Sequence, residues 1–246
     1  TEEGRVALLR AHARHLERMG DESAVRAAWT KLRNAAPDDA EALRALAALH
    51  ARAGDVDEQL EALRSLLARE EENGARRQLL LEIAVVQEER KRDLPGAIST
   101  LRRLLEVSPY DAEALSRLDV LCVQQERWID LADVLAREEK AAAQRGDAAA
   151  QVEFLFRLAE LREGRLLDSE GAFALYRRIL EIDPAHARTH ARLEAILDED
   201  PTHLEAIELL ENAFRAAGDA ARLADILEAR VAATHDAEAR RAVLVE

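Results

Sequence analysis

The sequence predicts an all-α protein in which a pair of helices is repeated along the chain. Hydrophobic residues make up 48% of the sequence and aromatic residues only 3%. The core must therefore consist mainly of Ala, Leu, Ile and Val, and Ala and Leu favour helices. Five Pro and nine Gly leave few of the turns that many short strands would need. Residues 78–109 also return without a gap as residues 153–184, and a chain that repeats one unit builds a stack of units.

The repeat is carried by identical residues at a spacing of 75 positions. The residues that return are Asp93, Gly96, Ala97, Arg102, Arg103, Leu105, Glu106 and Pro109, as Asp168, Gly171, Ala172, Arg177, Arg178, Leu180, Glu181 and Pro184. Pro37 precedes Pro109 by 72 residues and belongs to the same series. We interpret the series as a two-unit repeat, in which a regular helix pair that ends at Pro alternates with a longer pair that lacks Pro.

The first units each show a helix, a tight turn and a second helix. Apolar residues at helical spacing flank Gly20-Asp21, namely Leu9, Ala13, Leu16, Val25, Trp29 and Leu32. Leu43, Leu46 and Ala47 likewise precede Gly54-Asp55, and Leu63 and Leu66 follow it. Gly provides a left-handed helix end, and Asp provides the cap of the next helix. Each pair spans about 34 residues.

The later units depart from this regular pattern. The first helices near residues 80–84 and 155–159 carry one extra residue before the turn. Stretches 67–76 and 136–148 are charged and lack Pro, which predicts longer second helices or extended connections. Beyond Pro201 the pattern weakens and suggests two more helices, with a partial third from Asp236. We expect thirteen or fourteen helices in all.

These observations favour one elongated repeat domain over residues 1–246, with clear repeats in residues 1–200 and divergent or partial repeats in residues 201–246. The chain begins without Met and ends inside an apolar helical pattern. We therefore expect it to be a fragment of a longer array.

The net charge of the chain limits the kinds of molecule that it is expected to bind. The chain holds 35 Lys and Arg against 49 Asp and Glu, a net charge of −14. This charge repels nucleic acid phosphates and acidic membrane faces, so we expect no nucleic acid and no membrane partner, and we favour basic or neutral partners. Nearly all the positive charge is Arg, a bias that we attribute to bacterial coding at high GC content. The compartment is left open, with the cytoplasm favoured.

Several residue clusters could suggest an enzyme, but none has the full set of metal ligands or catalytic partners that an active site needs. The pairs His12/His15 and His186/His190 share a helix face, yet no third metal ligand is specified. Cys122 stands among apolar residues and is expected in the core, with no His partner assigned by any motif. We therefore expect no catalysis, no metal and no cofactor.

The remaining aromatic and acidic clusters have structural interpretations. We expect core positions, in preference to a ligand cage, for Trp29, Trp128, Phe154, Phe173, Tyr176 and Phe214. Runs of Glu beside Arg or Lys, at residues 70–72, 88–89 and 138–139, are expected on solvated helix faces.

The unit resembles the tetratricopeptide repeat (TPR) family over residues 5–200. In that family a small residue is followed by an aromatic four positions later and a Pro eight after that, as in Ala172, Tyr176 and Pro184. The same spacing joins Val25, Trp29 and Pro37, and small residues stand where the helices of a pair should cross, at Ala13, Ala47, Ala84 and Ala159. The resemblance implies a right-handed superhelical solenoid of TPR-like helix pairs.

The resemblance also implies a binding groove. In this family the first helices of the pairs line a concave surface, whose exposed positions follow the buried Leu by one residue and again by five. Carried onto this chain, the positions are Arg10, Arg14, Arg44, Ala48, Leu81, Val85, Ser116, Val120, Phe156 and Glu160. Such a groove fits a peptide or amphipathic helix with an acidic end and an apolar stretch. The competing interpretation is that neighbouring repeats cover Leu81, Val85 and Val120.

The function expected from the sequence is a noncatalytic scaffold that binds a protein or peptide in this groove. The alternative is a structural module that packs against its own copies or against other repeats. Part of the family grips C-terminal carboxylates with a Lys, Arg and Asn clamp. That clamp is not expected here, because the Asn residues lie near helix ends or on a second helix, at Asn34, Asn73 and Asn212.

Overall fold

A computed structural model describes residues 2–243, with side chains placed through residue 233. All regular structure among these residues is helical, with thirteen α-helices, two short π-helices and no strand. The predicted all-α class and the predicted number of helices are confirmed. The contacts of the chain divide it into two units, Thr1–Leu121 and Cys122–Glu246.

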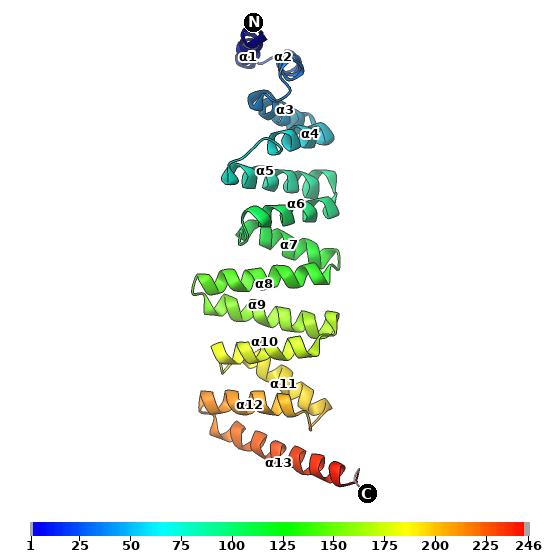
Figure 1. Ribbon diagram of the computed structural model, residues 1–246, viewed down its shortest axis with the longest axis vertical. Coiled ribbons are helices and arrows are strands. Elements are labelled where there is room, and N and C mark those ends of the chain that lie inside the picture. The colour runs from blue at the N-terminus through cyan, green and yellow to red at the C-terminus, as the bar shows by residue number, and fades with distance from the viewer. Residues whose placement is uncertain (1, 244–246) are drawn as a thin grey trace. The chain divides into compact units, whose positions relative to one another are not determined.

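Helices that follow one another in the chain pack side by side within each unit (Figure 1). Unit 1 contains α1 (Glu2–Met19), α2 (Glu22–Ala35), α3 (Ala40–Ala53), α4 (Val56–Leu67), α5 (Asn73–Val85), η1 (Val86–Lys91), α6 (Leu94–Val107) and most of α7 (Ala112–Gln124). Unit 2 contains α8 (Trp128–Gln144), α9 (Ala148–Leu161), η2 (Arg162–Leu166), α10 (Ser169–Ile182), α11 (Ala187–Glu199), α12 (Leu204–Ala217) and α13 (Ala220–Val243).

The predicted turn residues end and begin the helices. Gly20 and Gly54 follow α1 and α3 with φ of 80° and 88°, a left-handed conformation that Gly adopts without a steric cost. The Asp21 carboxylate accepts a hydrogen bond from the Ala24 N–H and caps α2. Asp55 makes no such bond to α4, because its carboxylate binds Arg26 and His50 instead, at 3.0 and 3.2 Å.

The extra residue predicted in two first helices is accommodated as a π-helical turn. α5 continues into η1 and α9 continues into η2, and the wider i to i+5 turn absorbs the inserted residue. Each π-helix ends at a residue other than Gly with positive φ, Arg92 at 60° and Leu167 at 54°. The insertion therefore changes the winding of the helix and leaves the pairing of first and second helices intact.

The two charged stretches that lack Pro have different structures. Residues 68–72 connect α4 to α5, and the Glu72 carboxylate caps α5 through the N–H groups of Gly74 and Ala75. The second stretch instead lengthens a helix, because α8 runs to Gln144. A third helix beginning at Asp236 was a wrong expectation, since α13 runs from Ala220 to Val243 without a break. No Gly or Pro interrupts the sequence of α13.

The cores of both units consist mainly of Leu and Ala with a few large aromatic residues. Trp29, Phe173, Tyr176 and Phe214 are at most 5% exposed, as predicted. Cys122 is fully buried in an apolar cluster of unit 2, which confirms its predicted core position. The remaining two aromatics, Trp128 and Phe154, are half-buried beside this cluster.

Glu139 corrects the expectation that residues 138–139 lie on a solvated face. Its side chain is 4% exposed and forms an ion pair of 2.5 Å with Arg178, and it also accepts a hydrogen bond from Gln151 at 2.7 Å. The residue lies on α8 where α9 and α10 pack close by, so a buried carboxylate needs both partners. Sequence spacing along α8 could not reveal these partners, because they belong to other helices.

Candidate functional site

Arginines of one first helix bind carboxylates of the next at the start of unit 1. We call the exposed surface of α1, α3, α5 and α7 in unit 1 the first-helix face. Arg10 of α1 binds Asp39, which caps α3, and Arg14 binds both oxygens of Glu41 at 2.5 and 2.6 Å. The expected basic end of the groove is therefore matched by acidic residues of the same chain.

The pKa of Asp39 reflects two opposing effects at this contact, burial and hydrogen bonding. Burial acts to raise the pKa of the Asp39 carboxyl, but the hydrogen bonds from Arg10 and from the Ala42 N–H outweigh burial, so the pKa is lowered. Asp39 is thus held ionised by its cap and its ion pair. Arg10 contributes to the link between α1 and α3.

The middle of the first-helix face is less polar. Leu81 and Val85 on α5 are half-buried, whereas Ser116 and Val120 on α7 are exposed, Val120 by 63%. Neighbouring repeats therefore cover Leu81 and Val85 in part, as the competing interpretation expected. They do not cover Val120 within unit 1. Arg117 on α7 reaches back to Glu88 of η1 at 2.9 Å.

Phe156 in unit 2 is buried, contrary to the expectation that it faces a groove. Its ring is 3% exposed and lies beneath residues of α11 and its cap. The Arg188 guanidinium stacks 4.1 Å from the ring centre, and the His186 ring packs edge-on at 5.5 Å. Arg188 also binds Glu153 at 2.9 Å and Glu160 at 3.5 Å. A residue position inside one helix could not reveal this cover, because the next first helix supplies it.

A partly buried polar network lies next to Phe156. The Tyr176 hydroxyl donates to Glu163 at 2.8 Å, and Arg192 binds both Glu163 oxygens at 2.9 and 2.6 Å. The hydrogen bond from Arg192 is the main cause that lowers the pKa of Glu163. Burial, together with the hydrogen bond to Glu163, raises the pKa of Tyr176. Each of these side chains has a hydrogen-bond partner, so the network stabilises the packing of α10 against η2 and α11.

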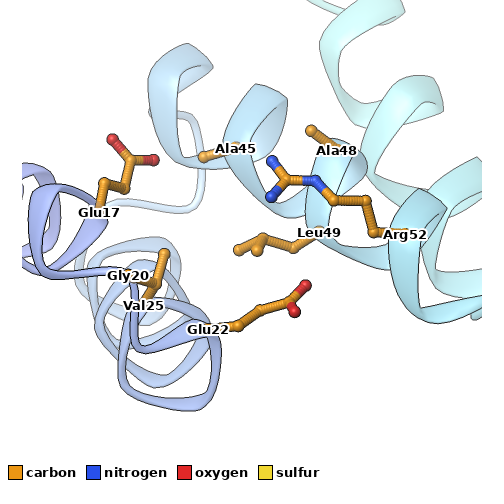
Figure 2. A pocket seen from close by; sticks show the side chains of 8 residues that line it. All are labelled: Glu17, Gly20, Glu22, Val25, Ala45, Ala48, Leu49 and Arg52. Carbon is orange, nitrogen blue, oxygen red and sulfur yellow. The ribbon is translucent and has the colours of Figure 1, made fainter.

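A hollow of about 320 Å³ opens on the first-helix face between the end of α1, the start of α2 and α3 (Figure 2). Val25 and Leu49 form its apolar floor and are 5% and 4% exposed. Glu17, Glu22 and Arg52 stand around this floor, and the Arg52 guanidinium reaches over Leu49. The Trp29 indole N–H holds the Glu17 carboxylate at 2.9 Å. Within the described residues, Glu22 and Arg52 form no ion pair.

A second hollow, of about 260 Å³, shares a wall with the first. Leu63, Leu66 and Leu79 form its floor, and the residues that reach its rim are Arg44, Gln78 and Glu82. Ala48 of α3 lines both hollows. Arg44 is 63% exposed and lies 3.9 Å from Glu70, a weak contact. Glu82 has no ion-pair partner in the part of the chain that the structure describes.

Four of the charged residues at these hollows were not predicted from the sequence, namely Glu17, Glu22, Arg52 and Glu82. Arg52 follows the predicted groove position Ala48 by four residues, which places it on the same helix face. Extending the predicted series by one helical turn would have found it. Glu22 and Glu82 carried no comparable signal, because Glu22 belongs to a second helix and Glu82 follows the buried Leu79 at a position that the family pattern does not mark.

His186 and His190 have structural roles, whereas His12 and His15 are exposed on α1. His186 caps α11 by accepting from the Thr189 N–H, and His190 is buried with its ring edge-on to Phe214 at 4.9 Å. Burial lowers the pKa of both histidines. No group of three His, Cys, Asp or Glu side chains that could hold a metal occurs among the described residues. Within the same residues, no helix combines the length and apolar character that a membrane span requires.

The helix pairs have the packing that the resemblance implied. Small residues lie buried where the two helices of a pair meet, with Ala13, Ala84 and Ala159 fully buried and Ala47 4% exposed. Ala172 and Tyr176 are fully buried as well, and Pro184 lies two residues beyond the end of α10. The fold is a TPR-like repeat of helix pairs.

Solved structures similar to the chain include TPR proteins. YrrB, described as a TPR protein with an unusual peptide-binding site, is 15% identical over 73% of this chain and 88% of that chain, with a TM-score of 0.41. A tetratricopeptide repeat protein from Parabacteroides merdae is 17% identical over 91% of each chain, with a TM-score of 0.41. The human IFIT1 dimer with m7Gppp-AAAA is 16% identical over 92% of this chain and 53% of that chain, with a TM-score of 0.43.

No protein-family model matches the sequence. No curated protein matches it either. Because the three TM-scores lie below 0.5, the TPR-like assignment rests on the helix pairs and the buried small residues of this chain.

Proposed function

We propose that the chain is a noncatalytic interaction scaffold that binds a protein or peptide along the first-helix face. Two adjacent hollows on this face carry the proposal, because each combines an apolar floor with charged side chains at the rim. Peptide-binding surfaces use this combination, in which apolar contacts supply affinity and polar groups fix orientation. The stacked helix pairs hold both hollows on packed helices, so the site is largely preformed.

The proposed contact residues differ from the predicted groove. Arg44 and Ala48 line hollows and are retained, and Leu81, Val85, Ser116 and Val120 continue the same face of unit 1. Phe156 is not a contact residue in this proposal, because Arg188 and His186 cover it.

Blocking the wall that both hollows share tests the proposal. We expect peptides selected from a random displayed library to bind the wild-type chain and to lose affinity at least tenfold with Ala48→Trp. Ala48 is exposed between the hollows, so a large side chain there fills them without disturbing the core. The matched control is Ala53→Trp, an exposed position near the end of the same helix and outside both hollows. Peptides that bind both variants equally would contradict the proposal.

The second candidate function is self-association, which the surface of α13 favours. A shallow hollow of about 440 Å³ lies beside Leu227, Val231 and Ala232, and Val231 is 56% exposed. Paired apolar residues on an exposed helix face are typical of protein contacts. We expect light scattering to show association that Val231→Lys removes, and a strict monomer at high concentration would count against this candidate.

A further inference from the structure

We propose that the two hollows of unit 1 bind successive basic side chains, Lys or Arg, of one linear peptide. The proposal rests on the proposed function and names the chemistry of its ligand. It follows from the charges that remain unmatched on the first-helix face, from the length of the side chains that fit the hollows, and from the wall that the hollows share.

Three acidic and two basic side chains line the two hollows, namely Glu17, Glu22, Glu82, Arg44 and Arg52. Arg10 and Arg14 favoured an acidic ligand in the sequence, but Asp39 and Glu41 bind them. Elsewhere on the face, Arg117 is bound by Glu88. Among the residues that the structure describes, Glu22, Glu82 and Arg52 have no ion-pair partner.

The first hollow carries more acidic than basic groups. Glu17 and Glu22 face it from two sides, and Arg52 is its basic residue. The Trp29 indole holds Glu17 in place with a hydrogen bond, and Arg14, one turn earlier on α1, attracts the Glu17 charge. An acidic ligand side chain that approached Arg52 would meet both carboxylates. A basic side chain is attracted by the pair, and the net charge of −14 adds to this attraction at long range.

The second hollow has one acidic and one basic side chain at its rim. Glu82 stands at its rim without an ion-pair partner in the described chain, while Arg44 faces Glu70 as well as the hollow. Partial burial raises the pKa of the Glu82 carboxyl. A bound cation would supply the ion-pair partner that Glu82 lacks in the described chain.

The floors of the hollows suit long basic side chains. Lys and Arg place their methylene stems on apolar surface while the charged group stays at the rim. Val25 and Leu49 offer such a floor in the first hollow, and Leu63, Leu66 and Leu79 offer it in the second. The volumes of about 320 and 260 Å³ lie at or below the small end of small-molecule pockets, so each hollow suits one side chain.

The shared wall favours a single peptide over two separate ligands. Ala48 separates the hollows with one methyl group, which lets a peptide main chain pass close to α3. Arg44 and Arg52 lie one helical turn before and after Ala48 on α3. Their guanidinium groups can donate hydrogen bonds to main-chain carbonyls of the peptide.

The test compares labelled peptides of equal length by fluorescence anisotropy at low salt. One series places two Lys in a Gly-Ser background with one, two or three residues between them, and matched series carry Gln or Glu in place of Lys. We expect the Lys series to bind most tightly, with one spacing preferred, and binding to weaken as salt increases. The double variant Glu22→Gln, Glu82→Gln should weaken Lys-peptide binding about tenfold, as expected for two partly exposed ion pairs.

The matched control is the double variant Glu58→Gln, Glu61→Gln. These two exposed carboxylates of α4 lie outside both hollows, so the control has the same net charge as the test variant. It should retain wild-type affinity within about twofold. Thermal unfolding should show that Glu22→Gln, Glu82→Gln is as stable as the wild type, which separates lost binding from lost folding.

Three outcomes would overturn the proposal. Glu peptides that bind as tightly as Lys peptides, or Lys binding that the control weakens as much as the test variant, would show that the hollows do not select basic side chains. Either result would leave the scaffold function standing if Ala48→Trp still abolished binding. Absence of binding by every designed peptide and by every library peptide would remove the scaffold proposal as well.

Discussion

Two helix pairs contain π-helices, α5–η1–α6 in unit 1 and α9–η2–α10 in unit 2. Their backbones are similar, but their polar contacts differ. Asp93 and Asp168 cap the second helices through Gly96 and Gly171, at 3.0 and 2.9 Å. Each π-helix ends in a left-handed residue other than Gly. Each also supplies a Glu that binds an Arg of the next first helix, Glu88 with Arg117 and Glu163 with Arg192.

The interiors of the two pairs differ. In unit 1 the buried polar contact is a 2.7 Å hydrogen bond from Thr100 to Gln87, and Leu101 fills the core. In unit 2 the residue equivalent to Leu101 is Tyr176, whose hydroxyl binds Glu163. The repeated backbone therefore tolerates different side-chain chemistry as long as each buried polar group has a partner.

The outer surfaces differ as well, and this difference bears on function. Leu81 is half-buried on α5 near the second hollow, whereas the equivalent Phe156 on α9 is covered by Arg188. The contrast shows that equivalent positions of a repeat can be open in one unit and closed in another. Binding positions therefore cannot be transferred between repeats by sequence position alone.

The largest effect that we expect is from Tyr176→Ala, which should lower the free energy of unfolding by about 3–5 kcal/mol. The ring is fully buried, so the variant leaves a cavity and an unmatched contact at Glu163. Tyr176→Phe keeps the ring and should cost about 1 kcal/mol. Urea denaturation measures both. Equal losses would show that the hydroxyl, and not the packing of the ring, distinguishes unit 2 from unit 1.

The equivalent pair Phe156→Ala and Leu81→Ala should separate a fully covered position from a half-buried one. We expect Phe156→Ala to lower the free energy of unfolding by about 3 kcal/mol and Leu81→Ala by about 1 kcal/mol. The reason is that Phe156 is fully removed from water, whereas Leu81 is only half-buried. Thermal and urea unfolding of the two variants provide the comparison. A Phe156→Ala variant as stable as the wild type would return this residue to the exposed surface predicted from the sequence.

The ion pair of Glu163 should make the stability of unit 2 depend on pH. The hydrogen bond from Arg192 lowers the pKa of Glu163 below its ordinary value of 4.5. The stability contributed by the ionised form is therefore complete above that value and is lost as the pH falls through the lowered pKa. The advantage of wild type over Glu163→Gln should be about 1 kcal/mol near pH 6 and shrink toward pH 3, allowing for solvent screening.

Urea midpoints across this pH range measure the effect, with Glu58→Gln as the control, because Glu58 is exposed on α4 and has no described ion pair. An advantage that stays constant over the whole range would show that the ionisation of Glu163 does not contribute.

The smallest effect concerns the left-handed residues that end the π-helices. Leu167→Gly and Arg92→Gly should each raise the free energy of unfolding, by less than about 1 kcal/mol, because Gly adopts positive φ without a Cβ clash. Leu167 is 82% exposed and Arg92 is exposed too, so little packing is lost. Equal gains would confirm that the two ends are equivalent. A loss in one of them would reveal a contact that the comparison overlooks.

The sequence predicted the helix pairs because their determinants are local. Apolar spacing, Gly at left-handed ends, Asp caps and Pro beyond second helices each act within one turn, and they mark most of the helix boundaries. The extra residue in two first helices was also visible. Its form as a π-helix was not, because both a longer turn and a wider helix accommodate one inserted residue.

The sequence by itself thus determined the all-α repeat, the small and aromatic residues of its core, and the acidic balance of the chain. Only the tertiary structure decided which charges stay unmatched and which side chains stay exposed, as Arg10, Phe156 and Glu82 show. The physical reason is that partners on the next helix pair lie about 30 residues away in the sequence, so local patterns do not specify the contacts between successive repeats.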